Sequence, residues 1–203
     1  MSARAVVSAS TSACAPAALF ADGFETGDVS RWSANFGLVA DSSQAHSGQF
    51  GARATSTGAA SAYAFAQLSA EQSTLDTTMW FKVLSLGANV VDVAKLRTGS
   101  GAALLTVFVS PTGVLGYQNN VTTVSTYSTT PVSQAVWHKL VVRTVINGTA
   151  SQVSTWLDDQ PVGALTKTES LGTTGVGRVQ VGENITGRTY DLALDDITIA
   201  PPA

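Results

Sequence analysis

The sequence is poor in charged side chains, which make up 12% of its 203 residues, well below the usual share of about a quarter. The 11 Lys and Arg residues are outnumbered by 14 Asp and Glu, so the formal net charge is −3. Binding to a phosphate backbone needs a concentrated positive field, so nucleic acid is an unfavourable partner. Ser, Thr, Asn and Gln must supply the surface polarity, which is common in secreted proteins, and we expect an extracellular or cell-surface location.

Cysteine is nearly absent as well. Cys14 is the only one, which excludes an intrachain disulfide and a zinc cluster built from cysteines. It lies in residues 1–18, a small and polar segment without periodicity, which we expect to be a disordered leader or a residual export segment. Residues 201–203 (Pro-Pro-Ala) are expected to be a linker stub.

Long apolar runs and helical periodicity are also missing. No run approaches the ~18 residues of a membrane helix, so we expect no membrane insertion, and a helical turn is indicated only near residues 69–73. Roughly a dozen short strand-like segments, separated by turn residues, fill the chain instead. They predict one all-β domain over residues 19–200, a two-sheet antiparallel jelly-roll sandwich, monomeric and one module of a larger protein.

Individual segments give more specific expectations. Residues 75–83 alternate apolar and polar side chains, the pattern of a half-buried strand. Residues 90–96 and 103–109 are apolar on both faces, which predicts central strands. Residues 36–40 and 162–165 are each expected to form one strand. Among the large aromatic residues, two are expected in the core: Trp32 and Trp137.

Four stretches, in order along the chain, match motifs of a known family. They are Phe-Glu-Thr-Gly-Asp-Val-Ser-Arg-Trp in residues 24–32, a strand entry in residues 46–53, a Trp-His-Lys-Leu hairpin in residues 137–161, and Leu-Asp-Asp-Ile-Thr-Ile in residues 194–199. Together they resemble the concanavalin A-like lectin/glucanase and laminin-G-like jelly rolls of secreted bacterial proteins. Gln160 departs from the family pattern, which has glycine at this turn.

The resemblance implies a structural calcium ion where the first and last strands meet. Four carboxylates are its candidate ligands: Glu25 and Asp195, which match the family pattern, and Asp22 and Asp196 as second choices. Calcium binds carboxylate and carbonyl oxygens in flexible geometry, so turn carbonyls near residues 47–48 could add ligands. Alternatively, the two aspartates simply end a strand in solvent and Glu25 caps its loop.

The closing strand carries a break in its alternation. Leu192 and Leu194 share one phase, whereas Ile197 and Ile199 share the other. One extra residue at the intervening aspartates would explain the shift, so we predict a β-bulge there.

Catalytic motifs of this fold are not found. Glucanases carry an E-x-D-x-x-E run, but the glutamates here are isolated: Glu25, Glu71, Glu169 and Glu183. Polysaccharide lyases of the same fold carry Arg, Gln, His and Tyr on adjacent strands, and the sequence reveals no such cluster. His46 and His138 are expected at the surface. We therefore predict no catalytic residues and a chain that is not an enzyme.

Aromatic residues on polar strand phases point to carbohydrate. Trp80 and Trp156 alternate with apolar neighbours and could form flat platforms for sugar rings, with Tyr117 as a rim. Both tryptophans could equally lie in the core beneath a second sheet. We predict non-catalytic binding of a glycan or polysaccharide; a structural or adhesive module for a protein partner, and a hydrolase or lyase with an unrecognised site, remain alternatives.

Overall fold

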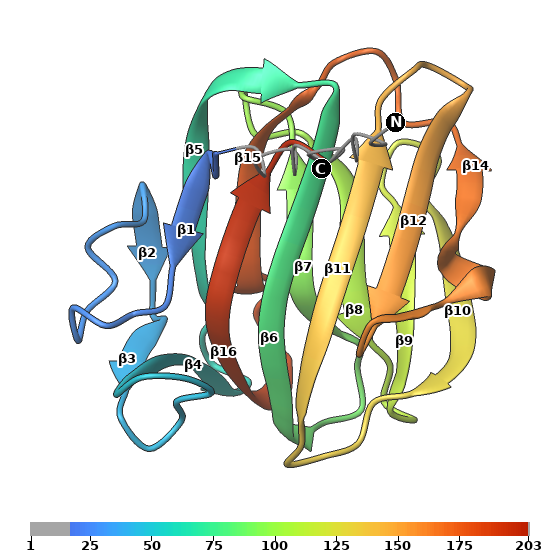
Figure 1. Ribbon diagram of the computed structural model, residues 1–203. Coiled ribbons are helices and arrows are strands. Elements are labelled where there is room, and N and C mark those ends of the chain that lie inside the picture. Colours follow the sequence, from blue (N-terminus) through green and yellow to red (C-terminus); the bar gives the residue numbers. More distant parts are fainter. Residues whose placement is uncertain (1–16, 203) are drawn as a thin grey trace, which may run out of the picture.

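The computed structural model describes residues 17–202, so nearly all of the expected leader, including Cys14, and the last residue of the stub lie outside the described part. Two antiparallel sheets pack face to face (Figure 1), which confirms the all-β, two-sheet jelly-roll prediction. Sheet A runs in the order β13-β12-β11-β6-β16-β4-β3, with β1 beside β16 and β14 beside β12. Sheet B runs in the order β10-β9-β8-β7-β15-β5-β2.

The strands of sheet A are β1 (Phe20–Asp22), β3 (Val39–Asp41), β4 (Gly51–Thr57), β6 (Thr74–Leu86), β11 (Trp137–Val145), β12 (Ser151–Leu157), β13 (Gln160–Pro161), β14 (Lys167–Glu169) and β16 (Thr189–Ala200). The strands of sheet B are β2 (Ala34–Phe36), β5 (Ala62–Gln72), β7 (Val91–Arg97), β8 (Ala103–Val109), β9 (Val114–Asn119), β10 (Val124–Pro131) and β15 (Val176–Glu183). One short 3₁₀ helix, η1, covers Gly163–Leu165.

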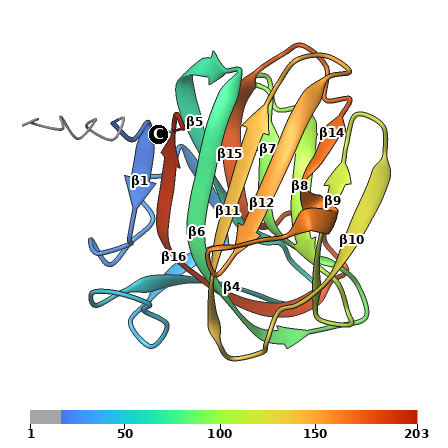
Figure 2. The same ribbon diagram turned by 45° about the vertical axis from the view of Figure 1, so that its right-hand side comes forward.

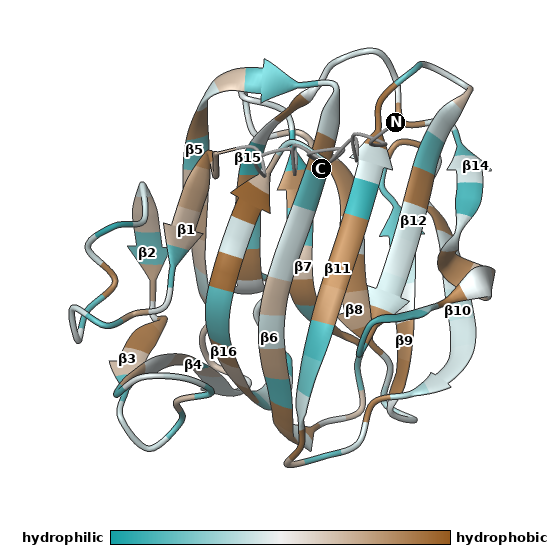
Figure 3. Ribbon diagram, viewed as in Figure 1, coloured by the Kyte–Doolittle hydropathy of each residue, from teal (hydrophilic) through white to brown (hydrophobic). Residues whose placement is uncertain are grey.

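Strand β6 shows how the sequence pattern builds the core. Its partly exposed and buried residues alternate strictly from Thr74 to Leu84, as predicted for residues 75–83. Leu75, Met79 and Phe81 are 0% exposed and face sheet B, because side chains alternate between the faces of a strand. Figure 3 shows the same alternation of brown and teal along the front strands. Burial of this apolar face is what holds the sheets together.

Strands β7 and β8 lie side by side within sheet B, with β15 and β9 as outer neighbours, which confirms the prediction of central strands. Several of their buried residues are nevertheless polar: Asp92, Lys95 and Thr106 are 3%, 6% and 4% exposed. These side chains lie on the outer face of sheet B, where they build the site described below.

Four local predictions were wrong. Residues 36–40 form two strands, because Gly37 adopts φ 82° and carries the chain from β2 in sheet B to β3 in sheet A. Residues 163–165 form η1 instead of a strand. Residues 69–72 continue strand β5 and make no helical turn. Trp32 is buried as expected, but Trp137 is only partly buried because it points outward from sheet A.

The predicted bulge in β16 is confirmed. Asp195 pairs with Trp80, and Thr198 pairs with Thr78, so β16 has one more residue than β6 between these two pairs, which defines a β-bulge. Asp196 sits in this bulge with φ 48°. Along the other side of β16, β4 pairs with its first half and β1 with its second half, so the bulge lies where the chain's first and last strands meet.

Within residues 17–202, no helix is long and apolar enough to cross a membrane. Figure 2, turned from the first view, shows the two sheets as separate layers. The inner faces form the core, so the outer faces of both layers are the sheet surfaces that a ligand could reach.

The core predicts a first stability measurement. Phe81→Ala removes a fully buried ring from the centre of sheet A and should lower the free energy of unfolding by about 3–5 kcal/mol. Thr78→Ala, on the outer face of the same strand, is the matched control and should change it by less than about 0.5 kcal/mol. Urea unfolding followed by tryptophan fluorescence measures both, and equal losses would contradict the assigned sidedness of β6.

Candidate functional site

Two of the predicted metal ligands bind a loop of the chain itself. The Glu25 carboxylate accepts hydrogen bonds from the backbone amides of Gln49, at 3.1 and 3.0 Å, and Phe50, at 3.1 Å. Asp195 Oδ2 accepts from the amides of His46 and Ser47 at 2.7 and 3.2 Å. The opening loop and the closing strand therefore both hold residues 46–50, and we call this junction the clasp.

The two aspartates of the bulge are held differently. Asp195 is 0% exposed, and its burial raises the pKa of the carboxyl, although three amide donors partly offset that effect. The third donor is the amide of Asp196, at 2.7 Å. Asp196 is more exposed and contacts the side chains of the 46–50 loop, with His46 Nδ1 at 2.7 Å and the Ser47 hydroxyl at 2.7 Å.

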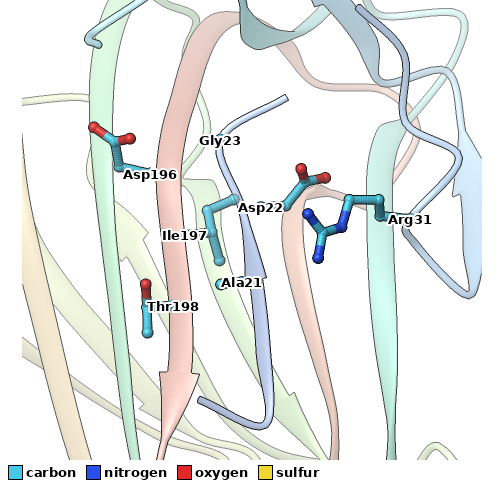
Figure 4. Close-up of a pocket in the computed structure, with 7 residues that line it drawn as sticks. All are labelled: Ala21, Asp22, Gly23, Arg31, Asp196, Ile197 and Thr198. Atoms are coloured by element: carbon cyan, nitrogen blue, oxygen red, sulfur yellow. The ribbon is translucent and has the colours of Figure 1, made fainter. Parts of the chain in front are cut away.

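Asp22, the remaining predicted ligand, has its own structural partners. Its carboxylate accepts from the Phe24 amide at 3.0 Å and from the Trp32 indole at 2.8 Å. Asp22 and Asp196 line a pocket of about 240 Å³, and in Figure 4 their carboxylates point to opposite sides of it. The structure therefore does not bring Asp22 and Asp196 together as joint ligands.

The remaining three carboxylates lie around Gly23. A side chain added there would meet Asp196 Oδ1 at 3.5 Å, Asp195 Oδ1 at 3.9 Å and Glu25 Cγ at 4.0 Å. In residues 17–202, however, no three His, Cys, Asp or Glu side chains converge closely enough to hold a metal by themselves. A calcium ion at this place would depend on backbone carbonyls, as calcium sites often do, and its presence stays a prediction.

The three aromatic residues predicted to bind sugar differ in their exposure to solvent. Trp80 and Trp156 are partly exposed on the outer face of sheet A. Trp80 stacks on His46, with ring centroids 3.8 Å apart, and Arg143 lies 5.9 Å from the Trp156 ring. Tyr117, by contrast, is 0% exposed because it points into the core, so the prediction that it rims a binding surface is wrong.

His138 is also not where the sequence suggested. It is 6% exposed, and its Nδ1 lies 2.7 Å from Asp158 Oδ2 while its Nε2 accepts the Ser133 amide at 3.0 Å. Acceptance at Nε2 assigns the proton to Nδ1, which donates to Asp158. The ring thus connects two turns and has no free nitrogen for catalysis.

The outer face of sheet B carries a site that the sequence did not reveal. A pocket of about 220 Å³ crosses strands β7 to β10 beneath the β15–β16 connection. Its lining is Val90, Asp92, Lys95, Thr106, Phe108, Gln118, Asn120, Ser125, Tyr127, Ile185 and Arg188. The mixture of hydroxyls, amides, charges and aromatic rings is typical of surfaces that bind polar ligands.

The pairing registers explain why these side chains meet. Lys95 lies opposite Thr106, and Thr106 lies opposite Gln118. On the other side, Lys95 lies opposite Gln180 of β15. Directly opposite residues share a face of the sheet, so one row of polar side chains runs across four strands.

Hydrogen bonds join this row into a network. Arg97 Nε donates to Gln180 Oε1 at 3.1 Å, and Gln180 Nε2 donates to Asn184 Oδ1 at 3.1 Å. Lys95 donates to the same Asn184 oxygen and forms an ion pair with Asp92 at 2.7 Å. The network therefore connects the pocket to Arg97, at the end of β7.

Arg97 and Arg178 are direct neighbours across β7 and β15. Burial and the charge of Arg178 lower the pKa of Arg97. Arg97 donates to neutral oxygens on Gln180 and Gly101, and Arg178 to neutral oxygens on Gln67 and Gly99. Among the residues the structure describes, neither guanidinium forms an ion pair with a carboxylate, so both keep capacity for an anion.

Two carboxylates balance the charge at the other end of the network. Arg188 pairs with Asp92, at 3.2 Å, and with Glu183. Burial, followed by the nearby Asp92 charge, raises the pKa of Glu183, which is 0% exposed. Lys95, Arg97, Arg178 and Arg188 outnumber the nearby carboxylates of Asp92, Glu183 and Glu71, so cationic charge prevails over this face of sheet B.

Comparison with known proteins supports the fold. No family model and no curated protein sequence matches the chain. Among solved structures it resembles "Cellulose induced protein, Cip1", at TM-score 0.72 and 15% identity, covering 89% of this chain and 96% of that one. It also resembles the endo-β-1,4-glucuronan lyase of the fungus Trichoderma reesei, at TM-score 0.69 and 13% identity, covering 91% and 96%. A carbohydrate esterase of the Shiga toxin-encoding bacteriophage phi24B gives 0.66 and 18%, covering 93% and 100%.

These structures define the class: a jelly-roll sandwich shared with carbohydrate-related proteins. They also overturn the prediction that the chain is not an enzyme. That prediction rested on missing motifs, yet a lyase and an esterase share the fold at 13% and 18% identity, so a missing motif excludes no activity. At such identities the likeness establishes the fold alone.

The polar cluster around Arg97 was missed because its members are far apart in sequence. Arg97 on β7 donates to Gln180 on β15, and Tyr63 on β5 lies opposite Gly182, two residues along β15 from Gln180, so only strand pairing brings these three residues to one region. The signal was weak: Gln180 and Arg178 interrupt an otherwise apolar strand, and Arg97 ends another. Neither histidine joins this cluster, because His46 and His138 both belong to the sheet A side.

The clasp yields a test of its geometry. A side chain at Gly48 would meet the Glu25 carboxylate at 2.3 Å, and Gly48 has φ +65°. Gly172→Ala carries only the backbone penalty, since its φ is +77° with nothing within 4 Å, and should cost about 1–2 kcal/mol. Gly48→Ala should cost on the order of 1–3 kcal/mol more, because it also displaces Glu25.

Thermal unfolding of the two variants measures this difference directly. Equal destabilisation would contradict the Glu25 contacts at the 46–50 loop.

Proposed function

We propose that this chain is a secreted, concanavalin A-like carbohydrate-active protein that binds an acidic polysaccharide across the outer face of sheet B and cleaves it by elimination. The observation that carries the proposal is the Arg97–Arg178 pair, two adjacent guanidiniums without a carboxylate partner among residues 17–202. The fold shared with a glucuronan lyase supports the same direction.

The charge distribution favours an anionic ligand. The protein is acidic overall, with a formal net charge of −3, yet this face concentrates Lys95, Arg97, Arg178 and Arg188 against three carboxylates, Asp92, Glu183 and Glu71. Guanidinium groups bind carboxylates through paired, charge-assisted hydrogen bonds. A uronate carboxylate would relieve the repulsion between Arg97 and Arg178, and Gln180 holds Arg97 in place by accepting from its Nε.

Elimination requires few protein groups. A base removes the proton next to the carboxylate, its electrons form a carbon–carbon double bond, and the glycosidic oxygen leaves with a proton. Arg97 and Arg178 would stabilise the negative charge that develops on the carboxylate. Tyr63, on the same face and near enough to influence the charge of Arg97, is the candidate for proton transfer, because a phenol can both accept and donate a proton.

The proposal predicts discrimination by charge. β-1,4-Glucuronan should bind and release unsaturated ends, measured by ultraviolet absorbance, whereas a neutral β-1,4-glucan should do neither. Arg97→Gln should weaken glucuronan binding about tenfold or more, because it removes charge-assisted hydrogen bonds. Titration calorimetry measures the affinity.

Arg143→Gln is the matched control, since Arg143 lies on the outer face of sheet A and pairs with Asp76 at 2.6 Å. It should leave glucuronan binding unchanged. Equal binding of the neutral glucan, or equal losses in the two variants, would overturn the proposal; binding without new unsaturated ends would overturn the elimination step.

A second candidate surface is the outer face of sheet A, where Trp80 and Trp156 are partly exposed. Both are available to a glycan at their free edges, although His46 covers part of Trp80. This surface would take a neutral sugar, because its arginines are already paired: Arg53 with Asp191 and Arg143 with Asp76.

We also propose that a calcium ion stabilises the clasp. The support is the donor set around Gly23, where Glu25, Asp195 and Asp196 approach one another, and the full burial of the Asp195 carboxylate. A cation there would offset the cost of burying a charge. Its role would be structural, because the clasp lies on the sheet A side and outside the sheet B network.

Chelation tests the calcium proposal. Removal of calcium should lower the melting temperature, because a ligand that binds only the folded state stabilises it. Glu25→Gln keeps the side-chain size but removes a charged ligand, so its melting temperature should respond little to the chelator. A wild-type melting temperature that ignores both chelator and added calcium would show that amide hydrogen bonds alone hold the clasp.

A further inference from the structure

Two aromatic residues lie at the far end of the pocket from Arg97. Phe108 of β8 and Tyr127 of β10 pack edge to face, with ring centroids 5.2 Å apart at 62°. Phe108 is 3% exposed, whereas Tyr127 is 53% exposed. The inner ring thus supports an outer ring that remains open to solvent.

A glycine between them makes this arrangement possible. Phe108 lies opposite Gly116, and Gly116 lies opposite Tyr127. A side chain at Gly116 would meet the Phe108 ring at 2.6 Å, so only glycine lets the two aromatic rings meet across β9. The pair is therefore fixed on the sheet and does not depend on a loop.

The surroundings of the pair are polar. Gln118, Asn120 and Ser125 line the same pocket, and Thr106 donates to Asn120 at 2.7 Å. An aromatic ring with amides and hydroxyls around it suits a sugar, which offers an apolar ring face and a rim of hydroxyls.

The distance of the Phe108–Tyr127 pair from the arginine pair limits which ligands could contact both. Tyr127 shares a row with Asp92, three strands from β7, and Arg97 lies five residues further along β7. With strands about 4.8 Å apart and a rise of about 3.3 Å per residue, Tyr127 is on the order of 20 Å from the arginine pair, along a diagonal of the sheet. The polar row of Lys95, Thr106 and Gln118 crosses the strands between them. A glycan running across the strands could contact both places, but a short fragment could reach only one.

We propose that Phe108 and Tyr127 form a distal sugar-binding subsite, which makes this protein selective for long acidic oligosaccharides over short ones. The inference rests on the proposed function and adds the direction and length of the bound chain. The glycan crosses the strands of sheet B, with one sugar on Tyr127 and a uronate carboxylate at Arg97 and Arg178.

The test compares glucuronan disaccharide and hexasaccharide by titration calorimetry. Tyr127→Ala should weaken hexasaccharide binding about three- to tenfold, as expected for loss of one aromatic contact, and leave disaccharide binding unchanged. Tyr127→Phe should retain the wild-type preference, because stacking does not need the hydroxyl. Val124→Ala is the control, since Val124 is similarly exposed, at 56%, on the opposite face of β10.

The outcomes separate the two proposals. If the wild type binds both fragments and Tyr127→Ala binds the hexasaccharide equally well, the distal subsite is overturned and the proposed function stands. If Tyr127→Ala weakens both fragments alike, Tyr127 contacts the reactive centre and the subsite is again overturned. If the wild type binds neither fragment, the proposed function fails and the subsite fails with it.

Discussion

The Asp195 carboxylate, buried and held by three backbone amides, is the interaction on which the closure of this sandwich depends. A buried carboxylate is tolerated only where donors replace its lost water. Here the donors come from the 46–50 loop and from the bulge itself. The bulge turns Asp195 and Asp196 toward the chain's opening segment, which lets β1 and β4 share one side of β16 and seals the edge of the core.

The two outer faces of the sandwich differ in how they treat charge. On sheet A, Arg53 and Arg143 each form a two-pronged contact with an aspartate, at distances of 2.6–2.9 Å. On sheet B, Arg97 and Arg178 donate hydrogen bonds only to neutral oxygens among the described residues. A guanidinium that is already paired with a carboxylate contributes little to the binding of an anionic ligand. An unpaired guanidinium next to another positive charge favours binding of an anion, because the anion relieves the repulsion. This contrast, more than pocket size, is the reason the proposal places the ligand on sheet B.

The sequence predicted the fold better than the site, for a physical reason. Strand alternation in residues 75–83 and the phase break at Asp195 are local signals, and both were confirmed because burial acts on each strand separately. The change of sheet at Gly37 was not predicted, because a single glycine with positive φ does not alter the hydrophobic pattern of the residues around it. Tyr63, Arg97 and Gln180 come from three strands, and their meeting depends on pairing order, which a single sequence does not encode locally. Tyr117 was predicted at the surface because Gln118 and Asn119 follow it near a turn. These polar neighbours do not determine which face of β9 carries the Tyr117 ring, and the ring lies in the core.

The location of the polar row on strand interiors has a consequence for how this protein can vary. Loops tolerate insertions because they bear no register. A one-residue insertion in β15, however, would exchange its faces, sending Arg178 and Gln180 into the core and Val179 and Val181 to the surface. The outer polar row and the core packing thus depend on the same alternation of side chains, so an insertion that changes one also changes the other. Such a sheet would diversify by substitution at fixed positions. The same strand positions would then face outward in distant relatives, even where overall sequence similarity had disappeared.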